Sequence, residues 1–493
     1  MGCIPAMPVS ESIISRDQRK AAATLLRTLA PAATELGELF TRAGHELALV
    51  GGPVRDVFLG KSPADLDLTT DAVPEKVLEI VRQWADKTWT VGIEFGTIGL
   101  RKGDTVFEVT TYRSEAYQRG SRKPDVRYGT SLEDDLLRRD FTINAMAARL
   151  PDYELVDPFG GLAALKEKVI RTPGRPSDSF SDDPLRILRA ARFAARLGFR
   201  VDPGVTEAME SMAGRLSIVS VERITDELTK LMLTPDPVYG LDLLVRTGVA
   251  VQVVPELPEL RMEVDEHHRH KDVYQHSLTV LKQAMDLEDR YDLTQDLVLR
   301  LAAVLHDIGK PKTRSLLPGG KVAFHHHEVV GAKMARKRLT ELKFSKDVIA
   351  DVSKLIGLHL RFHGYGDGEW TDSAVRRYVR DAGPMLSRLH VLTRADCTTR
   401  NARKAARLSA AYDALEERIE ALREAEELDR IRPELDGGEI MSILGLKPGP
   451  LVGKARNHLL ELRLEHGELG RERVIQELLA WAEGEGLRPA DSQ

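Results

Sequence analysis

Cysteine is almost absent from this chain of 493 residues, which contains only Cys3 and Cys397. Two cysteines give no disulfide framework, and such scarcity is typical of proteins kept in a reducing compartment. The opening residues hold no basic segment followed by an apolar stretch, so we expect no secretory signal peptide. Together these features predict a cytoplasmic protein.

Long hydrophobic runs are absent as well, because no apolar stretch approaches the roughly 20 residues that a bilayer crossing needs. We therefore expect no membrane partner. An excess of basic residues is also missing: 71 lysines and arginines face 76 aspartates and glutamates, which gives a formal net charge of −5. Any nucleic-acid site must then be a local basic face rather than a consequence of overall charge.

A repeat of fixed period is not found either, and the chain is too long for one compact core. Residues 20–43 have the pattern of one amphipathic helix, short apolar strands then alternate with helices to about residue 150, and the remainder is helical. The predicted fold is multidomain, with an α+β first domain built on a mixed sheet and all-α domains after it. The expected domains are residues 20–172, 173–260, 261–400 and 401–493.

The segment "ADLDLTT" places two aspartates one residue apart. The period of two in a strand puts Asp65 and Asp67 on one face and leaves the intervening leucines to face a core. Two carboxylates this close repel each other, and a bound divalent cation removes that cost. Carboxylate oxygens suit Mg²⁺, which also keeps waters and substrate phosphates as ligands.

Two further features support a metal-bound triphosphate at this place. Gly51 and Gly52 allow backbone amides to approach phosphates, and the helix after them offers its N-terminus to the same anion. Glu108 in "FEVTTYR" is the candidate third carboxylate, because a hairpin turning at residues 102–104 would return it beside the aspartate pair. This combination suits nucleotidyl transfer, in which metal ions orient the attacking hydroxyl and the pyrophosphate leaving group.

The order of motifs resembles that of the bacterial class II tRNA nucleotidyltransferases, the CCA-adding enzymes, whose close relatives include the bacterial poly(A) polymerases. The resemblance rests on "LVGGPVRDVFLG", "DLDLTT", "LLRRDFTINAMA", "DPFGG", "DDPLRILRAARFAARLGF" and "VERITDEL". It implies a nucleotidyltransferase head over 20–172 and a helical neck over 173–260. It also implies CTP, ATP and tRNA as partners, with no role for DNA, and Mg²⁺ as the cofactor of the head.

The neck motif contains an aspartate and an arginine whose chemistry suits base recognition. With Pro184 at the first helical position, Asp183 is expected at the N-cap and Arg186 one turn on. Cytosine and adenine both present an amino donor beside a ring-nitrogen acceptor, so a carboxylate and a guanidinium together would accept C and A and reject U and G. A capped helix with solvated arginines is the alternative interpretation.

The resemblance also implies nucleotide-binding roles for other residues of the quoted head and neck motifs. It assigns Asp183 and Arg186 as the protein template, with Arg189 as a helper for base or triphosphate. It assigns nucleotide binding to Arg55, and contacts with the sugar and phosphates to Arg138, Arg139, Asp140 and Asn144, although Arg139 and Asp140 could simply pair with each other. The polar, basic segment 113–131 would be the loop that switches the site from C to A addition.

A third part of the chain holds most of the fourteen histidines. Their order resembles that of an HD-superfamily phosphohydrolase, in which imidazole and carboxylate ligands hold one or two ions such as Mn²⁺, Ni²⁺, Fe or Zn²⁺. His325 and His326 crowd the position chosen for His327. Hydrolysis of phosphoesters on RNA ends and a catalytically silent scaffold both remain open. The expected ligands are His276, His306, Asp307, His327, His359 and Asp396.

These features together predict template-independent addition and repair of the CCA end of tRNA, from CTP and ATP with release of pyrophosphate. The segment 401–493 is expected to bind tRNA. Two alternatives stay open: a poly(A) polymerase, which shares the head, and a metal-dependent HD phosphodiesterase or phosphatase whose head only binds RNA.

Overall fold

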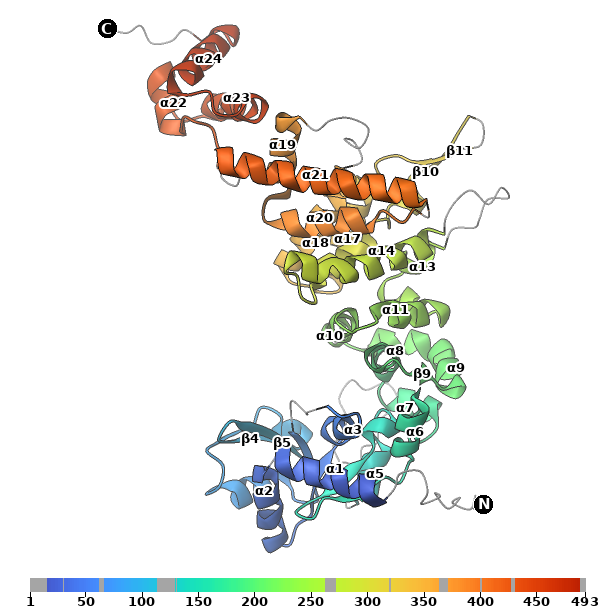
Figure 1. Cartoon of the computed structure of the whole chain (residues 1–493). Helices are drawn as coiled ribbons and strands as arrows, with labels where there is room; N and C mark the ends of the chain where they lie inside the picture. The colour runs from blue at the N-terminus through green and yellow to red at the C-terminus, as the bar shows by residue number, and fades with distance from the viewer. Residues whose placement is uncertain are drawn as a thin grey trace. The chain divides into compact units, whose positions relative to one another are not determined.

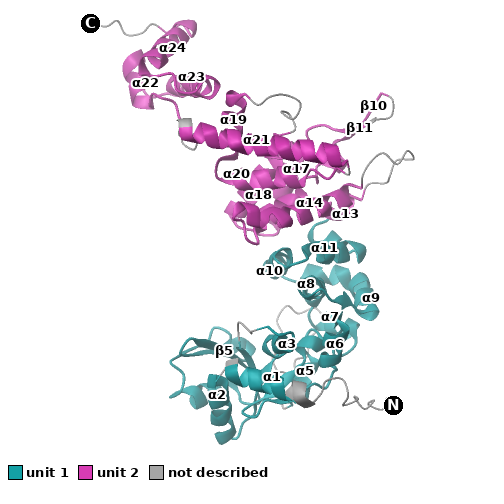
Figure 2. Cartoon of the chain, viewed as in Figure 1, with its two compact units in different colours: residues 1–255 teal, residues 256–493 magenta. Residues whose placement is uncertain are grey.

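The computed structural model describes residues 16–29, 31–61, 66–112, 129, 131–261, 272–318, 321–362, 371–399, 401–426 and 431–487. The chain divides into two compact units, Met1–Pro255 and Glu256–Gln493 (Figure 2). The division falls five residues before the boundary predicted at residue 260, and the boundaries at 172 and 400 stay predictions. Among the helices of the described residues, none is both long enough and apolar enough to cross a membrane.

The first unit is built on a mixed seven-stranded sheet with the strand order β3-β4-β5-β2-β1-β6-β7. Strands β2 and β5 are parallel, and every other pair in this sheet is antiparallel. The strands are β1 (Leu47–Val50), β2 (Leu66–Thr70), β3 (Lys87–Trp89), β4 (Thr97–Lys102), β5 (Thr105–Thr111), β6 (Ala147–Arg149) and β7 (Glu154–Val156).

The hairpin between β4 and β5 is closed by two residues, because Lys102 pairs with Thr105. Gly103 has a φ of 57°, which such a tight hairpin requires and which glycine adopts at no steric cost. The carboxylate of Asp86 accepts the N–H of Gly103 at 2.7 Å and holds the turn. The hairpin predicted at residues 102–104 is therefore present. It pairs β5 with β4, and the other edge of β5 pairs with β2.

Helices surround this sheet in the first unit (Figure 1). The single helix predicted over 20–43 is wrong, because α1 ends at Leu29 and α2 begins at Pro31. Proline lacks the N–H that a continuing helix needs, and its ring clashes with the preceding turn. The helices of this part are α1 (Arg16–Leu29), α2 (Pro31–Arg42), α3 (Gly52–Phe58), α4 (Pro74–Val81), η1 (Ile93–Phe95), α5 (Leu132–Leu137), η2 (Thr142–Asn144) and α6 (Gly161–Glu167).

The rest of the first unit is helical apart from one short parallel pair, β8 (Val169–Ile170) with β9 (Arg200–Val201). Gly198, with a φ of 67°, ends α8 and reverses the chain so that β9 can reach β8. The segment predicted as all-α thus contains one short strand. Its helices are α7 (Pro176–Asp182), α8 (Arg186–Leu197), α9 (Pro203–Met212), η3 (Ala213–Ile218), α10 (Val221–Met232), α11 (Pro237–Arg246) and α12 (Ala250–Val253).

The second unit is helical apart from one hairpin, β10 (Arg314–Leu317) with β11 (Lys321–Phe324). Helix α17 packs along α18, and α14 packs along α15 and α20. The helices are α13 (Glu256–Glu259), α14 (Val273–Leu287), η4 (Glu288–Tyr291), α15 (Leu297–Leu305), α16 (Lys310–Thr313), α17 (His327–Glu341), α18 (Lys346–Leu358), α19 (Asp372–Ala382), η6 (Gly383–Met385), α20 (Leu386–Ala395), α21 (Ala402–Glu426), α22 (Gly437–Leu444), α23 (Pro450–His466) and α24 (Arg471–Gly484).

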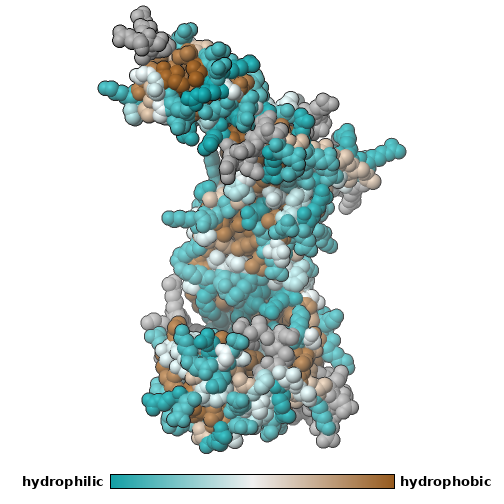
Figure 3. Space-filling model, turned by 60° about the vertical axis from the view of Figure 1, so that its left-hand side comes forward, coloured by the Kyte–Doolittle hydropathy of each residue, from teal (hydrophilic) through white to brown (hydrophobic). Residues whose placement is uncertain are grey.

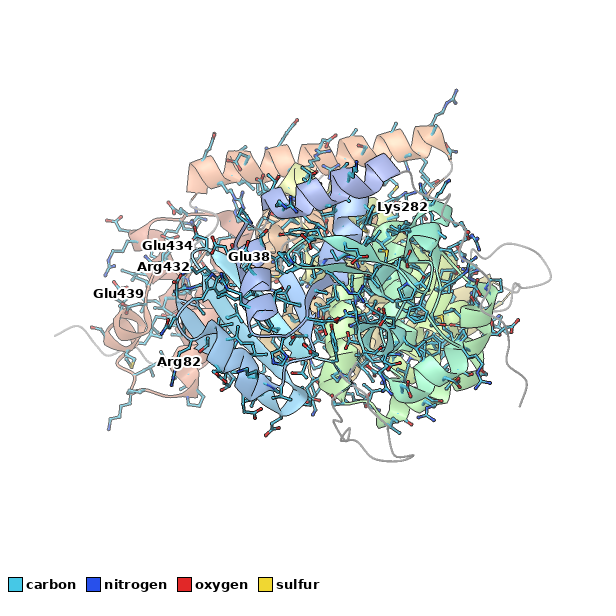
Figure 4. The ribbon with its side chains drawn as sticks, turned by 90° about the horizontal axis from the view of Figure 1, so that it is seen from below. Glu38, Arg82, Lys282, Arg432, Glu434 and Glu439 are labelled. Atoms are coloured by element: carbon cyan, nitrogen blue, oxygen red, sulfur yellow. The ribbon has the colours of Figure 1, made fainter. Side chains whose placement is uncertain are left out.

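The last three helices have a hydrophobic core of their own, which includes Leu435, Ile440, Leu459 and Leu478. Hydrophobic side chains also gather on the surface of this bundle (Figure 3). Glu434 and Glu439 belong to the same bundle (Figure 4), and Glu434 accepts the backbone N–H groups of residues 469 and 470. Glu439 completes a capping box at the start of α22, which fixes where that helix begins.

Candidate functional site

Two acidic residues face each other at the centre of the head sheet. Asp67 on β2 and Glu108 on β5 are direct partners in the parallel ladder, so their side chains leave the sheet on the same face. Both residues are exposed, whereas Leu66 and Leu68 on either side of Asp67 are buried. The strand alternation predicted for this segment is present at these three positions. Asp65 lies outside the described residues.

The glycine corner lies between β1 and α3. Gly51 has a φ of 71°, and a Cβ added there would lie 3.0 Å from a terminal guanidinium nitrogen of Arg139. Any other residue at position 51 would therefore be strained and would crowd Arg139. The N–H of Gly51 donates to the carbonyl of Met146 at 3.2 Å, and Gly52 begins the seven-residue helix α3.

Arg55 on α3 is buried beneath this corner. Its Nε donates to Asp56 at 2.8 Å, and one terminal nitrogen donates to Oδ1 of Asn144 at 2.6 Å. Asn144 in turn donates to Oδ1 of Asp140 at 2.9 Å. The side chains of Arg55, Asn144 and Asp140 thus form a hydrogen-bonded chain that connects α3 to the "RRDFTINAMA" segment.

Asp140 is the meeting point of head and neck within the first unit. Its Oδ2 accepts two hydrogen bonds from Arg189 on α8, from Nε at 2.8 Å and from a terminal nitrogen at 2.5 Å. Burial alone would raise the pKa of Asp140, but the charge of Arg189 and the hydrogen bonds from Asn144 and Arg189 outweigh it and lower that pKa. Asp140 therefore stays ionised and holds two segments together.

The pairing of Arg139 with Asp140 that the sequence left open is wrong, because Arg139 pairs with Asp135 at 3.3 Å. Arg189, which we expected to contact base or triphosphate, is occupied by Asp140 and lies 3.6 Å from Glu227. Glu227 also accepts from the buried Arg192 at 2.5 Å. Glu227 and Arg192 are not among the predicted site residues, although both lie in the motifs "VERITDEL" and "DDPLRILRAARFAARLGF".

The start of α8 differs from the prediction. Helix α8 begins at Arg186 rather than at Pro184, because the preceding residues form i→i+3 bonds such as Arg186 N–H to the carbonyl of Asp183, at 3.0 Å. Asp183 still caps this turn, since its carboxylate accepts the N–H of Leu185 at 3.1 Å. The proposed recognition pair therefore lies on a tight turn followed by a helix.

The side chains of Asp183 and Arg186 both form hydrogen bonds with residues outside the turn and helix that carry them. Asp183 accepts a hydrogen bond from Arg223 on α10 at 2.9 Å. Arg186 donates to the hydroxyl of Ser179 at 2.8 Å and to the backbone carbonyl of Arg138. No local pattern indicates Arg223 or Ser179 as partners of these two residues. Their contacts restrict the two side chains to a narrow range of orientations.

The six residues expected at the HD site lie together in the second unit. His276 Nε2 is 2.9 Å from Asp396 Oδ1, His306 Nε2 is 3.2 Å from Asp307 Oδ2, and His327 Nε2 is 3.3 Å from Asp307 Oδ1. Two sets have donor atoms within 4.8 Å of one another: His276, His306 and Asp396, and Asp307, His327 and His359. His325 and His326 are exposed, so the cluster takes in His327, the third histidine of the run.

The hydrogen bonds of three of these histidines fix their tautomers. His306, His327 and His359 each place Nδ1 within 2.9 Å of a backbone carbonyl three residues earlier. A carbonyl can only accept, so each Nδ1 carries a proton, and in the neutral ring each Nε2 presents a lone pair. Among the described residues, none of these three Nε2 atoms, nor Oδ1 of Asp307, has a hydrogen-bond partner. Lone pairs converging on carboxylates in a buried space fit a metal ion.

The pKa values describe the cluster without a metal ion. Burial would lower the pKa of His306, but the carboxylates of Asp307 and Asp396 raise it to about 10, so in that state Nε2 of His306 carries a proton, which a bound metal ion would displace. Burial and the charge of His306 lower the pKa of His359 to about 3. The cluster thus gathers positive charge around two buried carboxylates, and a metal ion would supply that charge directly.

Lys310, four residues after His306, also reaches this cluster. Its Nζ lies 2.6 Å from Oδ2 of Asp307 and 5.7 Å from the centre of the Phe324 ring. Its side chain is partly exposed, in contrast to the buried histidines. Lys310 is not among the predicted site residues, although its short spacing from Asp307 places both on one turn.

Three family models match the chain: a poly A polymerase head domain over residues 47–171, a probable RNA and SrmB-binding site of polymerase A over 198–260, and an HD domain over 273–401. The paired carboxylates lie in the first of these and the histidine cluster in the third. Fold and site thus define a nucleotidyltransferase of the poly(A) polymerase type joined to an HD domain. Both kinds of domain imply the use of divalent metal ions.

The A-adding tRNA nucleotidyltransferase of Deinococcus radiodurans is 34% identical over 448 residues, which cover 88% of this chain and 95% of that one. The chain belongs to the tRNA nucleotidyltransferase family. It is also 41% identical over 224 residues to the CCA-adding enzyme of Listeria monocytogenes, which cover 45% of this chain and about half, 55%, of that relative.

The fold is shared with a crystal structure of the Bacillus stearothermophilus CCA-adding enzyme in complex with CTP. The TM-score is 0.66 and the identity 24%, over 93% of this chain and 98% of that one. At this identity the likeness establishes the fold, and the assignment of individual residues depends on the geometry described above.

Proposed function

We propose that this protein adds and repairs the CCA end of tRNA from CTP and ATP, without a nucleic-acid template. The observation that carries the proposal is the pairing of Asp67 with Glu108 on adjacent parallel strands, in a chain of the tRNA nucleotidyltransferase family. The 3′ hydroxyl of tRNA attacks the α-phosphate of the nucleotide, and pyrophosphate leaves. Asp65, Asp67 and Glu108 would hold Mg²⁺, which orients both groups and offsets developing charge.

The nucleotide is bound by the residues around the glycine corner. The corner formed by Gly51 and Gly52 leaves room for phosphates beside backbone amides. Arg138 and Arg139 supply positive charge there, whereas Arg55, Asp140 and Asn144 are engaged with one another and act as positioning residues. We assign Arg189 to the same positioning set, because it is bound to Asp140.

The base is selected by Asp183 and Arg186. The carboxylate accepts from the amino group that C and A share, and the guanidinium donates to the adjacent ring nitrogen. Arg223 and Ser179 hold these two side chains in place, so the selection rests on preorganised donors and acceptors. The test is incorporation from UTP and GTP, which Asp183→Ala would raise relative to incorporation from CTP and ATP.

The length of the product separates this function from its alternatives. An end-labelled tRNA transcript without its CCA is incubated with Mg²⁺ and nucleotides and resolved at single-nucleotide resolution. Two additions with CTP alone and three with CTP and ATP support the proposal. A long ladder with ATP alone would make the protein a poly(A) polymerase. Extension only of a tRNA that already ends in CC would make it an A-adding enzyme.

The histidine cluster favours a second activity, hydrolysis of phosphoesters at RNA ends. Three convergent Nε2 lone pairs beside buried carboxylates support it, because such a set binds transition metals tightly. His276, His306, Asp307, His327, His359 and Asp396 would hold Mn²⁺, Ni²⁺, Fe or Zn²⁺, which supplies hydroxide near neutral pH.

The hydrolytic activity is tested with bis(4-nitrophenyl) phosphate and each metal in turn. Release of 4-nitrophenol that is lost in Asp307→Asn supports it. Turnover that is unchanged in this variant, or absent with every metal, would leave the cluster as a scaffold.

The domain limits given for head, neck, HD domain and tail belong to the same proposal, as does a location in the cytoplasm. The helical tail from residue 401 would bind the body of the tRNA. Removal of the three-helix bundle at 431–487, which has its own hydrophobic core, would weaken tRNA binding and leave the affinity for CTP unchanged.

A further inference from the structure

Strands β10 and β11 form a two-stranded ribbon that lies, in the chain, between Asp307 and His327 of the histidine cluster. Figure 1 shows the ribbon projecting from the helices of its unit. Arg314 is paired with Phe324, and Leu316 with Val322. Because paired residues share a face of an antiparallel ribbon, these four side chains lie on one face, which we call the ribbon face: Arg314, Leu316, Val322 and Phe324.

The ribbon face is accessible and positively charged. Arg314 is exposed, as is Lys312 just before the strand, and Leu316 is 72% exposed. Within the part of the chain that the structure describes, neither Lys312 nor Arg314 has an ion-pair or hydrogen-bond partner for its side chain. Packing within the unit therefore does not account for these cations or for the exposed leucine.

The base of the ribbon is attached to the histidine cluster by two contacts. The carbonyl of Phe324 accepts the Nδ1 proton of His327 at 2.9 Å. Lys310, which contacts Asp307 at 2.6 Å, lies 5.7 Å from the centre of the Phe324 ring. A strand lying on the ribbon face would thus end beside Lys310 and the cluster.

We propose that the ribbon face binds the single-stranded 3′ end of an RNA and directs its terminal phosphoester to the histidine cluster. The aromatic ring of Phe324 would stack on a base, and Lys312 and Arg314 would contact the phosphates. This inference rests on the hydrolytic function proposed for the cluster and specifies its substrate. The substrate is an RNA strand with a terminal phosphate or a 2′,3′-cyclic phosphate, rather than a free mononucleotide.

The reaction on a cyclic end consumes one water. Hydroxide forms a new bond to phosphorus, one of the two ring P–O bonds breaks, and the ribose oxygen that leaves takes up a proton. On a linear terminal phosphate, the same attack releases inorganic phosphate and a free 3′ hydroxyl. The reaction needs no oxidant, reductant or further co-reactant.

The first test compares two substrates of one chemistry, a 12-nucleotide RNA ending in a 2′,3′-cyclic phosphate and free 2′,3′-cyclic AMP. We expect the double variant K312E/R314E to lower kcat/KM for the RNA by about tenfold at 50 mM salt and to leave cyclic AMP unchanged. The ratio of kcat/KM for the RNA between wild type and double variant should shrink about 7-fold when the salt is raised to 200 mM. This follows because each of the two phosphate contacts adds a salt slope of roughly 0.7 for single strands.

Arg336→Glu is the matched control, since Arg336 is exposed on α17 and forms no ion pair with another described residue. This variant should change kcat/KM for either substrate by less than about twofold, as expected for a distant surface charge. Phe324→Leu should reduce hydrolysis of the RNA alone, because the backbone carbonyl that orients His327 is retained. Equal loss on both substrates in K312E/R314E would overturn the inference, as would no loss on either.

A second readout does not depend on turnover. The RNA carries 4-thiouridine next to its 3′-terminal phosphate and is cross-linked to metal-free protein, and the attached peptides are identified by mass spectrometry. Attachment within residues 310–327 supports the ribbon face even if the cluster proves silent. Attachment solely to head or tail peptides refutes it. Failure of bis(4-nitrophenyl) phosphate hydrolysis with ribbon cross-links present would instead refute the hydrolytic function.

Discussion

Replacing Arg189 by methionine should show how helix α8 supports the residues around the glycine corner. Arg189 on α8 gives Asp140 both hydrogen bonds that its Oδ2 receives from side chains, while Oδ1 keeps the N–H of Phe141 and Asn144 Nδ2. Asp140 is 7% exposed, so water does not replace the lost partner. Arg189→Met leaves a buried carboxylate with half of its partners.

The expected magnitude follows from that geometry. Removing one member of a buried ion pair costs about 3–5 kcal/mol, because the other charge remains uncompensated. Arg189 itself is about one third exposed and also lies near Glu227, so we expect the lower part of this range. The urea midpoint of the first unit should fall accordingly at pH 7.5.

The loss should depend on pH. In the wild type the pKa of Asp140 is lowered, so its contribution is present above about pH 4 and fades as pH falls further. In Arg189→Met the charge that mainly opposes burial is gone, while the hydrogen bond from Asn144 and the charge of Arg186 remain, so the pKa of Asp140 rises and the carboxyl takes up a proton more readily. The difference in free energy of unfolding between variant and wild type should therefore shrink from pH 7.5 to pH 5.

The assay is urea unfolding followed by circular dichroism, with KM for CTP measured alongside. KM should rise, because Asp140 positions Asn144 and through it Arg55 at the glycine corner. Arg196→Met is the control, since Arg196 is exposed two turns on along the same helix. An Arg189→Met protein as stable as this control at pH 7.5 would refute the reasoning.

Three further predictions follow from other parts of the molecule. Asp67→Asn and Glu108→Gln should each abolish nucleotide incorporation while leaving the melting temperature within a few degrees, since both residues are exposed; retained incorporation in both would contradict their role. Asp307→Asn should retain at most a small fraction of the wild-type content of transition metal, measured by mass spectrometry after dialysis, and an unchanged content would exclude the histidine cluster as the binding site. Burial lowers the pKa of His390 to about 4, so the unfolded chain takes up a proton below about pH 6.5 and the folded one does not. Stability should fall by up to about 3 kcal/mol between pH 6.5 and pH 4, and His390→Leu should lack this component of the pH dependence.

Local patterns were enough to indicate that Asp67 and Glu108 lie near each other in the head sheet. The period of two along β2 decides which face Asp67 occupies, and a two-residue turn at Gly103 decides where β5 returns. Both are short-range properties, and they indicate which strand faces Asp67 and Glu108 occupy. The parallel pairing of β2 with β5, which sets Glu108 directly opposite Asp67, is a long-range contact that only the structure shows. The histidine cluster could be named because ligand types in a fixed order are informative even without a fold.

The partners of the predicted residues could not be found in this way. Arg189 and Asp140 are 49 residues apart, and Arg223 and Asp183 are 40 apart. Nothing in the local sequence distinguishes an arginine that binds a ligand from one that holds a carboxylate. That distinction depends on how α8 and α10 pack, which is a property of tertiary structure.

The predicted limits of two helices were also wrong, and both errors involve a proline. The amphipathic pattern over 20–43 continues through Pro31, whose missing N–H ends the preceding helix. Pro184 suits the first position of a helix, but the chain first makes a tight turn that Asp183 caps. Hydrophobic periodicity conceals the break in the first case, and in the second the preference of proline for a helix start does not distinguish a helix from a turn.

The most direct test of the central proposal offers all four nucleoside triphosphates at once to a tRNA that lacks its CCA. The 3′ end of the product is then sequenced by mass spectrometry. The account predicts one product, extended by C, C and A in that order, with Asp67→Asn giving no product. Incorporation of U or G, a long run of A, or extension in Asp67→Asn would contradict it.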